Sequence, residues 1–404
     1  MMPVNMVSYR DAIWRRGVRR TRRRSVLGLV LLCGAASVFA CSVPGPLAPV
    51  VEVFRLRAPD GNAPVSQASG LHFGWVGGRH GLWLVCDRNS GPSANQVFFI
   101  QQGRLDAAEA GGTIVASEAI PLVGPSEGWA RFAHDRPAIP AEVMAELRHQ
   151  LENHAAGHLP VLDLEGITAG RSLADRAILD LFVIAEQPFN LVLQFRLAGE
   201  GPGSQAVLMD CFSYTEALSE RGGDGNDGLE GIAWTGRPGE FLLAEEGTRP
   251  FRASDVLHFF DHPRLMLTRL ADNRIVAMAR WSDRATESVR ARRGQPSQTL
   301  NALALWDQRR LLAVDRNGGW ILVADTGTGR TARWLNLYDP ARLNLRERLA
   351  DMPGSRRMVY VSIEGIARDE AGNLWMVDDP AMPEAFRESC LIRLRHPTSC
   401  PYPI

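Results

Sequence analysis

One pattern recurs along the chain and limits the fold more than any other feature. It consists of a short apolar strand carrying Glu-Gly or a relative, a turn, and a second strand that ends in an acid. The first halves are residues 69–72 (SGLH), 163–167 (DLEGI), 228–232 (GLEGI), 300–303 (LNAL) and 362–366 (SIEGI). The second halves are residues 81–87, 181–186, 240–245, 310–315 and 373–378. Self-similarity at a spacing of tens of residues indicates a repeat architecture.

Each unit continues with a further strand-like run, at residues 96–101, 191–197, 264–269, 320–324 and 391–395. Short strands separated by Gly, Asp and Asn turns are typical of propeller blades. A single such unit cannot bury both of its faces, but radial stacking in a ring does so. The sequence therefore predicts an all-β fold, a single β-propeller. Five blades are favoured, and six are the alternative if the long first interval hides one.

The two ends of the body and one insertion complete this architecture. Residues 49–57 (PVVEVFRLR) could form the outer strand of the last blade and so tie the ring together. Val143, Leu147 and Leu151 recur at helical spacing after Pro140, which predicts an amphipathic helix within a helical insertion at about 126–158. The composition, 45% hydrophobic and 22% charged, is that of a globular protein. We expect residues 49–404 to form the propeller.

The N-terminus has the pattern of an export signal. Residues 1–40 hold eight arginines against one acid, and residues 26–40 form an apolar stretch too short to span a bilayer. Residues 38–41 (VFAC) resemble a lipobox, which predicts lipidation of Cys41 after a tether at 41–48; ordinary cleavage after Ala40 is the alternative. Sec and twin-arginine export both remain open. We expect the periplasm or outer membrane, with a lipid anchor as the only membrane contact, or secretion if Cys41 is unmodified.

Charge and cysteine content narrow the partners further. Outside residues 1–40 the chain has seven more acids than bases, which argues against nucleic acid as a partner. An exported chain can form disulfides, and the body holds an even number of cysteines. Cys390 and Cys400 flank one short strand pattern and are the easiest pair to bridge, which leaves Cys86 with Cys211. Four cysteines allow three connectivities, and the sequence does not choose between them.

The first strand of a propeller blade lines the central channel, so equivalent positions form a ring. The Glu-Gly position gives Ser69, Glu165, Glu230, Asn301 and Glu364. Converging carboxylates repel each other, so either their pKa values rise or a cation lies between them. Carboxylate, amide and hydroxyl oxygens suit Ca²⁺ better than zinc. The glycine after each acid allows close backbone approach or a positive φ. We therefore predict a Ca²⁺ site formed by these five residues.

A second set of acids ends the second strand of each unit: Asp87, Glu186, Glu245, Asp315 and Asp378. Such acids either bind a ligand or accept hydrogen bonds from the N–H groups of turns and shape the turns. Three arginines lie near this set or near the repeats: Arg88, Arg249 and Arg316. Arginines can clamp a phosphoester substrate beside Ca²⁺, or they can form ordinary ion pairs. We predict a ligand-binding role for these acids and arginines and keep the structural alternative open.

The five motifs together, from SGLHFGW…LWLVCDRN through DLEGITAG, GLEGIAWTGRPGEFLLAEEG and LNALALWDQRRLLAVDRNGG to SIEGIARDEAGNLWMVDD, resemble the phytase-like domain family labelled "esterase-like activity of phytase". They are also similar to the SdiA-regulated calcium-binding propellers. The resemblance covers roughly residues 65–395 and implies an exported propeller that hydrolyses phosphoesters or esters. The chain departs from it in the helical insertion and at Asn301.

The repeat, its acidic positions and the resemblance predict two alternative functions. The first is metal-dependent hydrolysis of phosphate or carboxylic esters, with unknown catalytic residues. The second is a non-catalytic envelope propeller, a monomer that uses the same calcium for rigidity and binds a small-molecule ligand or an envelope protein on its face. No His–carboxylate pair recurs at a defined spacing in the repeats, which favours the second function. The resemblance favours the first.

Overall fold

The computed structural model describes residues 49–87, 95–152, 162–186, 189–214, 228–245, 264–281, 300–316, 318–339, 341–351, 361–379, 388–395, 397 and 400. All of them belong to one compact unit, residues 46–404. The predicted signal, Cys41, Arg88 and Arg249 lie outside the described residues. None of the described helices is long and apolar enough to cross a bilayer.

Among the described residues, the strands pair into five antiparallel groups of four. The first group is β2 (Ala68–Val76), β3 (Arg79–Cys86), β4 (Gln96–Gln101) and β6 (Glu118–Val123). The second is β7 (Leu164–Arg171), β8 (Leu179–Ala185), β9 (Leu191–Ala198) and β10 (Gln205–Ser213). The third is β11 (Leu229–Trp234), β12 (Glu240–Glu245), β13 (Arg264–Ala271) and β14 (Arg274–Arg280). The fourth is β15 (Leu303–Leu305), β16 (Arg310–Asp315), β17 (Trp320–Asp325) and β18 (Thr331–Asn336).

The fifth group joins the two ends of the body. It is β19 (Ile363–Arg368), β20 (Leu374–Asp378), β21 (Cys390–Arg395) and β1 (Val50–Arg57). The strand β1 runs antiparallel to β21, with Val53 opposite Ile392, and so forms the outer strand of this group. A short strand, β5 (Thr113–Val115), adds to the outside of β1 in parallel. The predicted closure of the ring by residues 49–57 is confirmed.

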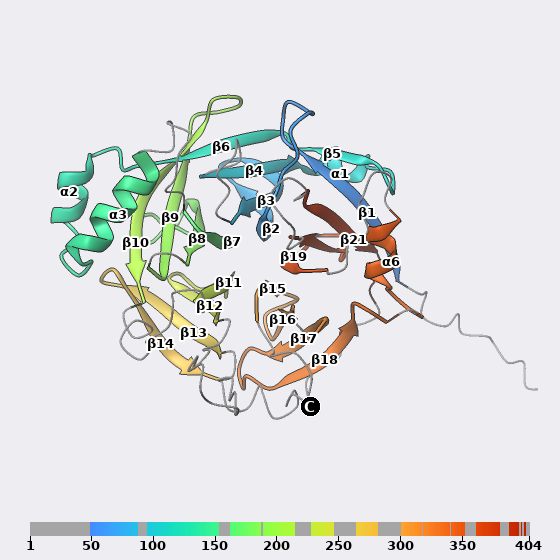
Figure 1. The fold of residues 1–404 in the computed structure, drawn as a ribbon. Coiled ribbons are helices and arrows are strands. Elements are labelled where there is room, and N and C mark those ends of the chain that lie inside the picture. The colour runs from blue at the N-terminus through green and yellow to red at the C-terminus, as the bar shows by residue number, and fades with distance from the viewer. Residues whose placement is uncertain are drawn as a thin grey trace, which may run out of the picture. The chain divides into compact units, whose positions relative to one another are not determined.

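The five groups stand around one axis as the blades of a propeller (Figure 1). The inner strands β2, β7, β11, β15 and β19 contact one another in that order, and β19 contacts β2 again. A separate hydrophobic cluster fills each of the interfaces between neighbouring groups of described strands. Apolar side chains therefore cover both faces of each blade, as radial stacking requires. The predicted β-propeller is confirmed, and the number of blades in the complete chain stays a prediction.

Outer strands of neighbouring blades also touch. Ala206 and Val207 of β10 pair in parallel with Leu122 and Val123 of β6, and Ser213 of β10 pairs with Arg274 of β14. These bridges merge the first three blades into one continuous twelve-stranded sheet. The backbone groups at this part of the rim are thereby paired instead of remaining exposed edges.

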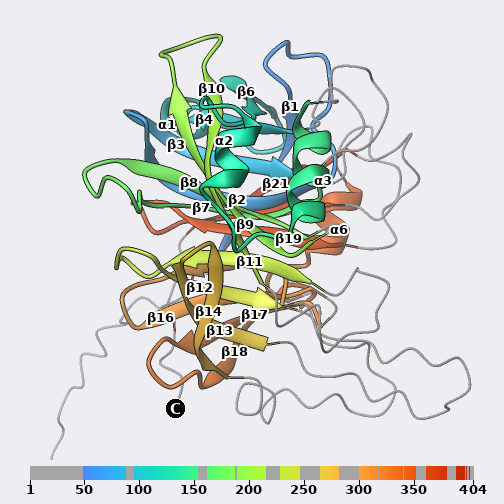
Figure 2. The ribbon, with the colours of Figure 1, turned by 90° about the vertical axis from the view of Figure 1, so that its left-hand side faces the viewer.

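Helices occupy the connections and the outside of the ring. They are α1 (Gln102–Asp106), α2 (Trp129–His134), α3 (Ala141–Glu152) and α6 (Leu345–Ala350). The helix α3 buries Val143, Leu147 and Leu151 in the cluster between the first two blades, so the predicted amphipathic helix is confirmed. Figures 1 and 2 show α2 and α3 on the outer side of these blades, away from the channel.

The four cysteines of the body are buried thiols in the structure, and the predicted bonds Cys390–Cys400 and Cys86–Cys211 are not formed. Cys86 and Cys211 lie in the clusters on opposite sides of the first blade. Cys390 and Cys400 share one cluster, and the Cys400 carbonyl accepts a hydrogen bond of 2.6 Å from Arg310 of the fourth blade. Burial raises the pKa of the Cys211 thiol to about 12.

Candidate functional site

The Glu-Gly motif coincides with a local distortion of the inner strands. In β7 the pairing passes from Leu164 opposite Ala185 to Ile167 opposite Val183, so Glu165 and Gly166 form a bulge against β8. The registers of β2, β11 and β19 shift at the same place in the motif. A bulge re-aims side chains and strengthens the local twist. The repeated motif thus marks the point where each of these inner strands bends at one end of the channel.

The glycines of the motif permit close approach between neighbouring blades. A Cβ atom on Gly166 would lie 2.6 Å from the carbonyl oxygen of Glu230, and one on Gly365 would lie 2.5 Å from that of Ser69. None of the motif glycines has a positive φ. Of the two roles considered for these glycines, close backbone approach is therefore the correct one.

The structure brings four of the five predicted ring residues to one cavity. Glu165, Glu230, Asn301 and Glu364 line a cavity of about 10 Å³ on the channel axis, and all four are buried. This volume is about the room that one water molecule requires, so it could hold a single small ion or water. Ser69 does not line the cavity; its hydroxyl donates a hydrogen bond of 2.6 Å to Oε2 of Glu165.

The ring carboxylates differ sharply in their partners. Oε1 of Glu364 accepts hydrogen bonds from the guanidinium of Arg316 at 2.7 Å and from the hydroxyl of Ser362 at 2.5 Å. Oε2 of Glu230 accepts one from the amide of Asn301 at 3.3 Å. Oδ1 of Asn301 and Oε2 of Glu364, by contrast, have no hydrogen-bond donor among the described residues. Two residues that line the cavity thus carry a buried acceptor oxygen without a donor, which costs free energy unless a cation or water supplies the contact.

Glu165 lies in the most acidic surroundings of the ring. Its carboxylate, that of Asp163 and that of Asp87 each place an oxygen within 4.8 Å of the others. Burial raises the pKa of Glu165 well above its usual value, and the negative charges of Asp87, Asp163 and Glu186 raise it further. The hydrogen bond from Ser69 opposes this rise in the pKa. Carboxylates gathered in this way favour a bound cation.

Asp163 is a member of this cluster that the repeat did not single out. It lies two residues before Glu165 and is almost fully buried. Its backbone carbonyl accepts a hydrogen bond from the N–H of Glu186 at 2.9 Å, which fixes it beside the end of β8. The signal was present in the sequence as the acid that opens DLEGI, because Gly228 and Ser362 occupy this position in the other two Glu-Gly motifs.

Three of the five acids that end the second strands are fixed by hydrogen bonds from backbone N–H groups. Oε1 of Glu186 accepts one from Gly228 at 2.6 Å. Oδ1 of Asp315 accepts one from Gly318 at 2.8 Å, and Oδ1 of Asp378 accepts one from Ser362 at 2.7 Å. Glu245 is buried at the end of β12. These bonds give Glu186, Asp315 and Asp378 a structural role, and ligand binding by the five acids stays a prediction.

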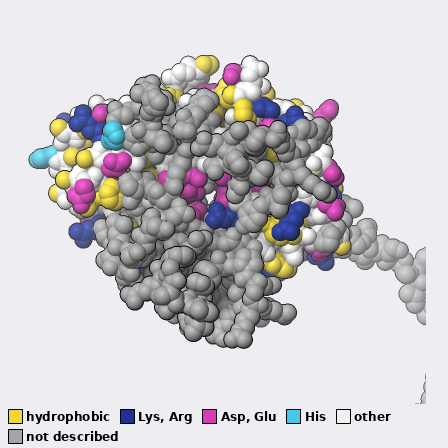
Figure 3. Space-filling view, in the orientation of Figure 1, with side chains coloured by type: hydrophobic (Ala, Val, Ile, Leu, Met, Phe, Trp, Pro, Cys, Tyr) yellow, Lys and Arg dark blue, Asp and Glu magenta, His cyan; other side chains and the backbone are white. Residues whose placement is uncertain are grey.

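Arg316 lies beside the ring and pairs with Glu364, so the ion-pair alternative describes this arginine in the structure. Its side chain is 25% exposed. Figure 3 shows acidic side chains gathered at the centre of this face, with a Lys or Arg side chain beside them.

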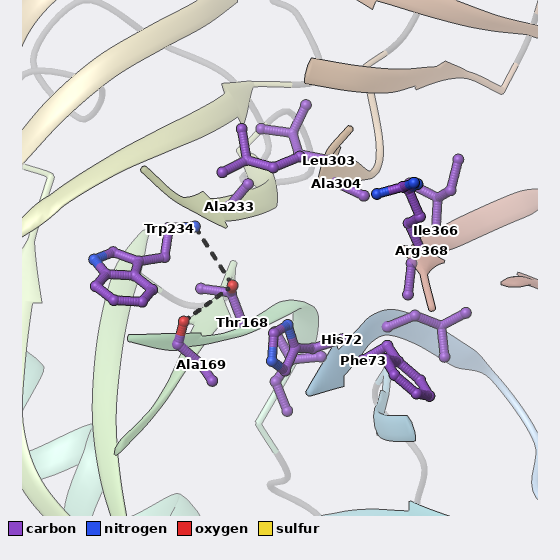
Figure 4. A pocket seen from close by; sticks show the side chains of 14 residues that line it. His72, Phe73, Thr168, Ala169, Ala233, Trp234, Leu303, Ala304, Ile366 and Arg368 are labelled. Carbon is purple, nitrogen blue, oxygen red and sulfur yellow. Dashed lines mark hydrogen bonds between the residues drawn. The ribbon is translucent and has the colours of Figure 1, made fainter. Parts of the chain in front are cut away.

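The channel changes character along its axis. Two residues after the ring position, Leu71, Ile167, Ile232, Leu303 and Ile366 form an apolar layer that borders the small cavity. Beyond this layer lies a second cavity of about 180 Å³ at the other end of the channel (Figure 4). The acid end and the opposite mouth are thus separated by aliphatic side chains.

Comparisons with known proteins give no family. No family model and no curated protein matches the chain. A solved aldose sugar dehydrogenase from Streptomyces coelicolor in its PQQ-bound form is 11% identical, with a TM-score of 0.39 over 86% of this chain and 98% of its own. A streptogramin B lyase is 10% identical, with a TM-score of 0.38 over 87% and 99%. At this similarity the neighbours' activities do not transfer, and the fold assignment rests on the strand pairing above.

Proposed function

We propose that this propeller binds a divalent cation, Ca²⁺ by its ligand chemistry, at the Glu165 side of the acidic ring. The observation that carries the proposal is the convergence of Asp87, Asp163 and Glu165 within 4.8 Å. Three carboxylates offer up to six oxygens, and Ca²⁺ takes six to eight oxygen ligands. The residues present therefore fit the ion, with carboxylates alone able to satisfy most of its coordination.

The proposed cation site lies at one side of the ring and is not shared equally by the five ring residues. Glu364 is already neutralised by Arg316, and Glu230 accepts a hydrogen bond from Asn301. Glu165 differs, because the charges that surround it are those of other acids. A cation therefore stabilises the protein most at Glu165, where it relieves the repulsion between buried carboxylates. Asn301 and Glu364 border the adjoining cavity and stay predicted ligands of the same acid end.

Calcium titration of the chelator-treated protein by calorimetry tests the site. The protein should bind Ca²⁺, and Glu165→Gln and Asp163→Asn should each weaken binding at least about tenfold, a loss of about 1.4 kcal/mol. Glu364→Gln should weaken it less, and the exposed Glu200→Gln should leave it unchanged. Absence of binding by the unaltered protein would refute the proposal. If Glu364→Gln lost calcium binding and Asp163→Asn kept it, the result would support a site shared by the ring residues instead.

Hydrolysis of phosphate or carboxylic esters is the second candidate, and the exposed part of Arg316 beside the acid ring favours it. A bound cation would polarise a phosphoryl or carbonyl oxygen, and an arginine would hold its negative charge. Turnover of p-nitrophenyl phosphate, p-nitrophenyl acetate and phytate, with Ca²⁺ and with chelator, tests it. Chelator-sensitive turnover of any of them would support the hydrolase. Turnover of none would leave a calcium-binding propeller without catalysis.

A further inference from the structure

The mouth of the channel opposite the acid ring holds the larger cavity. Its wall comes from the aliphatic layer and from residues three and four positions beyond the ring, and the fourth position holds a different residue in each blade. Besides aliphatic residues, these include His72, Phe73, Thr168, Trp234 and Arg368. Figure 4 shows the side chains of His72, Trp234 and Arg368 around the same opening.

Arg368 is the single charged residue among those that line this cavity. Its Nη1 donates a hydrogen bond of 3.1 Å to the carbonyl of Trp306, and its guanidinium lies 4.5 Å from the centroid of the Trp306 ring. These contacts fix the group in place. Its Nε atom is buried and has no acceptor among the described residues. A guanidinium held in position in the wall of a cavity is a ready partner for an anion.

The charge of Arg368 is not cancelled from within the cavity, because no acid lines it. Glu364 lies four residues earlier on the same strand, about 13 Å away at about 3.3 Å per residue, and its carboxylate already pairs with Arg316. The aliphatic layer also lies between the two ends of the channel. The two mouths of the channel therefore have opposite electrostatic character.

His72 adds a neutral polar group to the same wall. Its side chain makes no hydrogen bond to a described residue, and burial lowers its pKa to about 4. At neutral pH the imidazole is therefore uncharged, with one nitrogen as donor and one as acceptor. Thr168 already has a partner, because its Oγ1 accepts a hydrogen bond of 3.4 Å from the backbone N–H of Trp234 (Figure 4).

We propose that this mouth binds a small organic anion, with its carboxylate or phosphate on Arg368, a polar contact to His72, and its apolar body against Phe73, Trp234 and the aliphatic layer. Pockets of this kind are mostly apolar and carry a few polar groups that fix the orientation of the ligand. The site is separate from the proposed calcium site and does not depend on it.

Calorimetric titration of the whole protein with benzoate, phenyl phosphate and the neutral benzamide tests the proposal. At least one of the two anions should bind at concentrations below about 10 mM, and benzamide should bind at least about tenfold more weakly. Arg368→Gln should weaken anion binding at least about tenfold. The control Arg330→Gln, which alters an exposed arginine, should leave it unchanged.

Arg368 also contacts Trp306, so a second variant guards against misfolding. Ala304 lines the cavity from β15, and Ala304→Leu should abolish anion binding by filling the space while its thermal unfolding stays cooperative. Preference for benzoate over phenyl phosphate would indicate a carboxylate ligand, and the reverse a phosphate ester. The proposal is overturned if neither anion binds, if benzamide binds as tightly as the anions, or if both variants bind like the unaltered protein.

Discussion

Burial and neighbouring charges both act on the pKa of one carboxylate, that of Glu165. Glu165 is buried among acids, and its folded-state pKa is raised above its unfolded value. Its protonated form is therefore favoured on folding. Stability from this group is present at low pH and is lost as the pH rises through the raised pKa, where the folded state must ionise it. Bound calcium reverses this cost, because it stabilises the carboxylate.

Substitution of Glu165 separates these two effects. In calcium-free protein at pH 7, Glu165→Gln should raise the melting temperature, because it removes a buried charge while its amide oxygen still accepts from Ser69. In saturating calcium the same variant should melt below the unaltered protein. Differential scanning calorimetry with calcium and with chelator measures both, and Glu200→Gln is the control. A lower melting temperature without calcium would contradict the account.

His72 gives a pH dependence of the opposite sign. Its folded-state pKa of about 4 lies below the usual 6.5, so protons bind preferentially to the unfolded state. Its contribution is fully present above pH 6.5 and is lost as the pH falls toward 4, by at most about 3 kcal/mol. His72→Gln should therefore flatten the fall in unfolding free energy between pH 6.5 and 4 in urea titrations. His134→Gln, which alters an exposed histidine, should not; equal slopes in both variants would refute the assignment.

The inner strand is the element on which the site depends. Its bulge bends the strand at the ring position, and its glycine lets the next blade come close. Gly166→Ala should destabilise the protein by about 1–3 kcal/mol, because the added methyl meets the Glu230 carbonyl at 2.6 Å. Gly103→Ala in α1 is the matched control, since nothing lies within 4 Å there and alanine favours a helix. Urea unfolding compares the two, and equal stability would contradict the close approach.

The strand boundaries could be predicted from the sequence because each run of apolar residues ends at turn residues. Glu240–Glu245 and Arg310–Asp315 match the predicted strands at both ends. The position of the site at one side of the ring could not be predicted in this way. The partners of the ring acids, Ser69 for Glu165 and Arg316 for Glu364, come from other blades, and only the folded ring sets them. The cavity at the opposite mouth could not be predicted, because the residues that line it differ between blades and do not form a repeated motif.

At the scale of the whole molecule, closure of the ring depends on β1. Phe54 is fully buried between the last and first blades, and its ring centroid lies 6.0 Å from that of Trp375. Glu52 of the same strand accepts hydrogen bonds from Arg393 and Arg395 of β21. The N-terminal strand is thus held by packing and by charge.

Phe54→Ala should therefore destabilise the propeller by about 3–5 kcal/mol, because the truncation leaves a cavity in the closing interface. All five interfaces share the ring, so unfolding should remain a single transition at a lower temperature. The exposed Val50→Ala on the same strand is the control. Calorimetry measures both; a small effect, below about 1 kcal/mol, would show that the ring does not depend on β1.

A crystal structure with calcium tests most directly whether a cation lies at the Glu165 side of the channel. Anomalous scattering should give a peak within about 2.3–2.6 Å of carboxylate oxygens of Asp87, Asp163 and Glu165. A peak on the channel axis, equally distant from Glu165, Glu230 and Glu364, would contradict a site at one side of the ring. No peak at this end of the channel at saturating calcium would contradict the calcium site altogether.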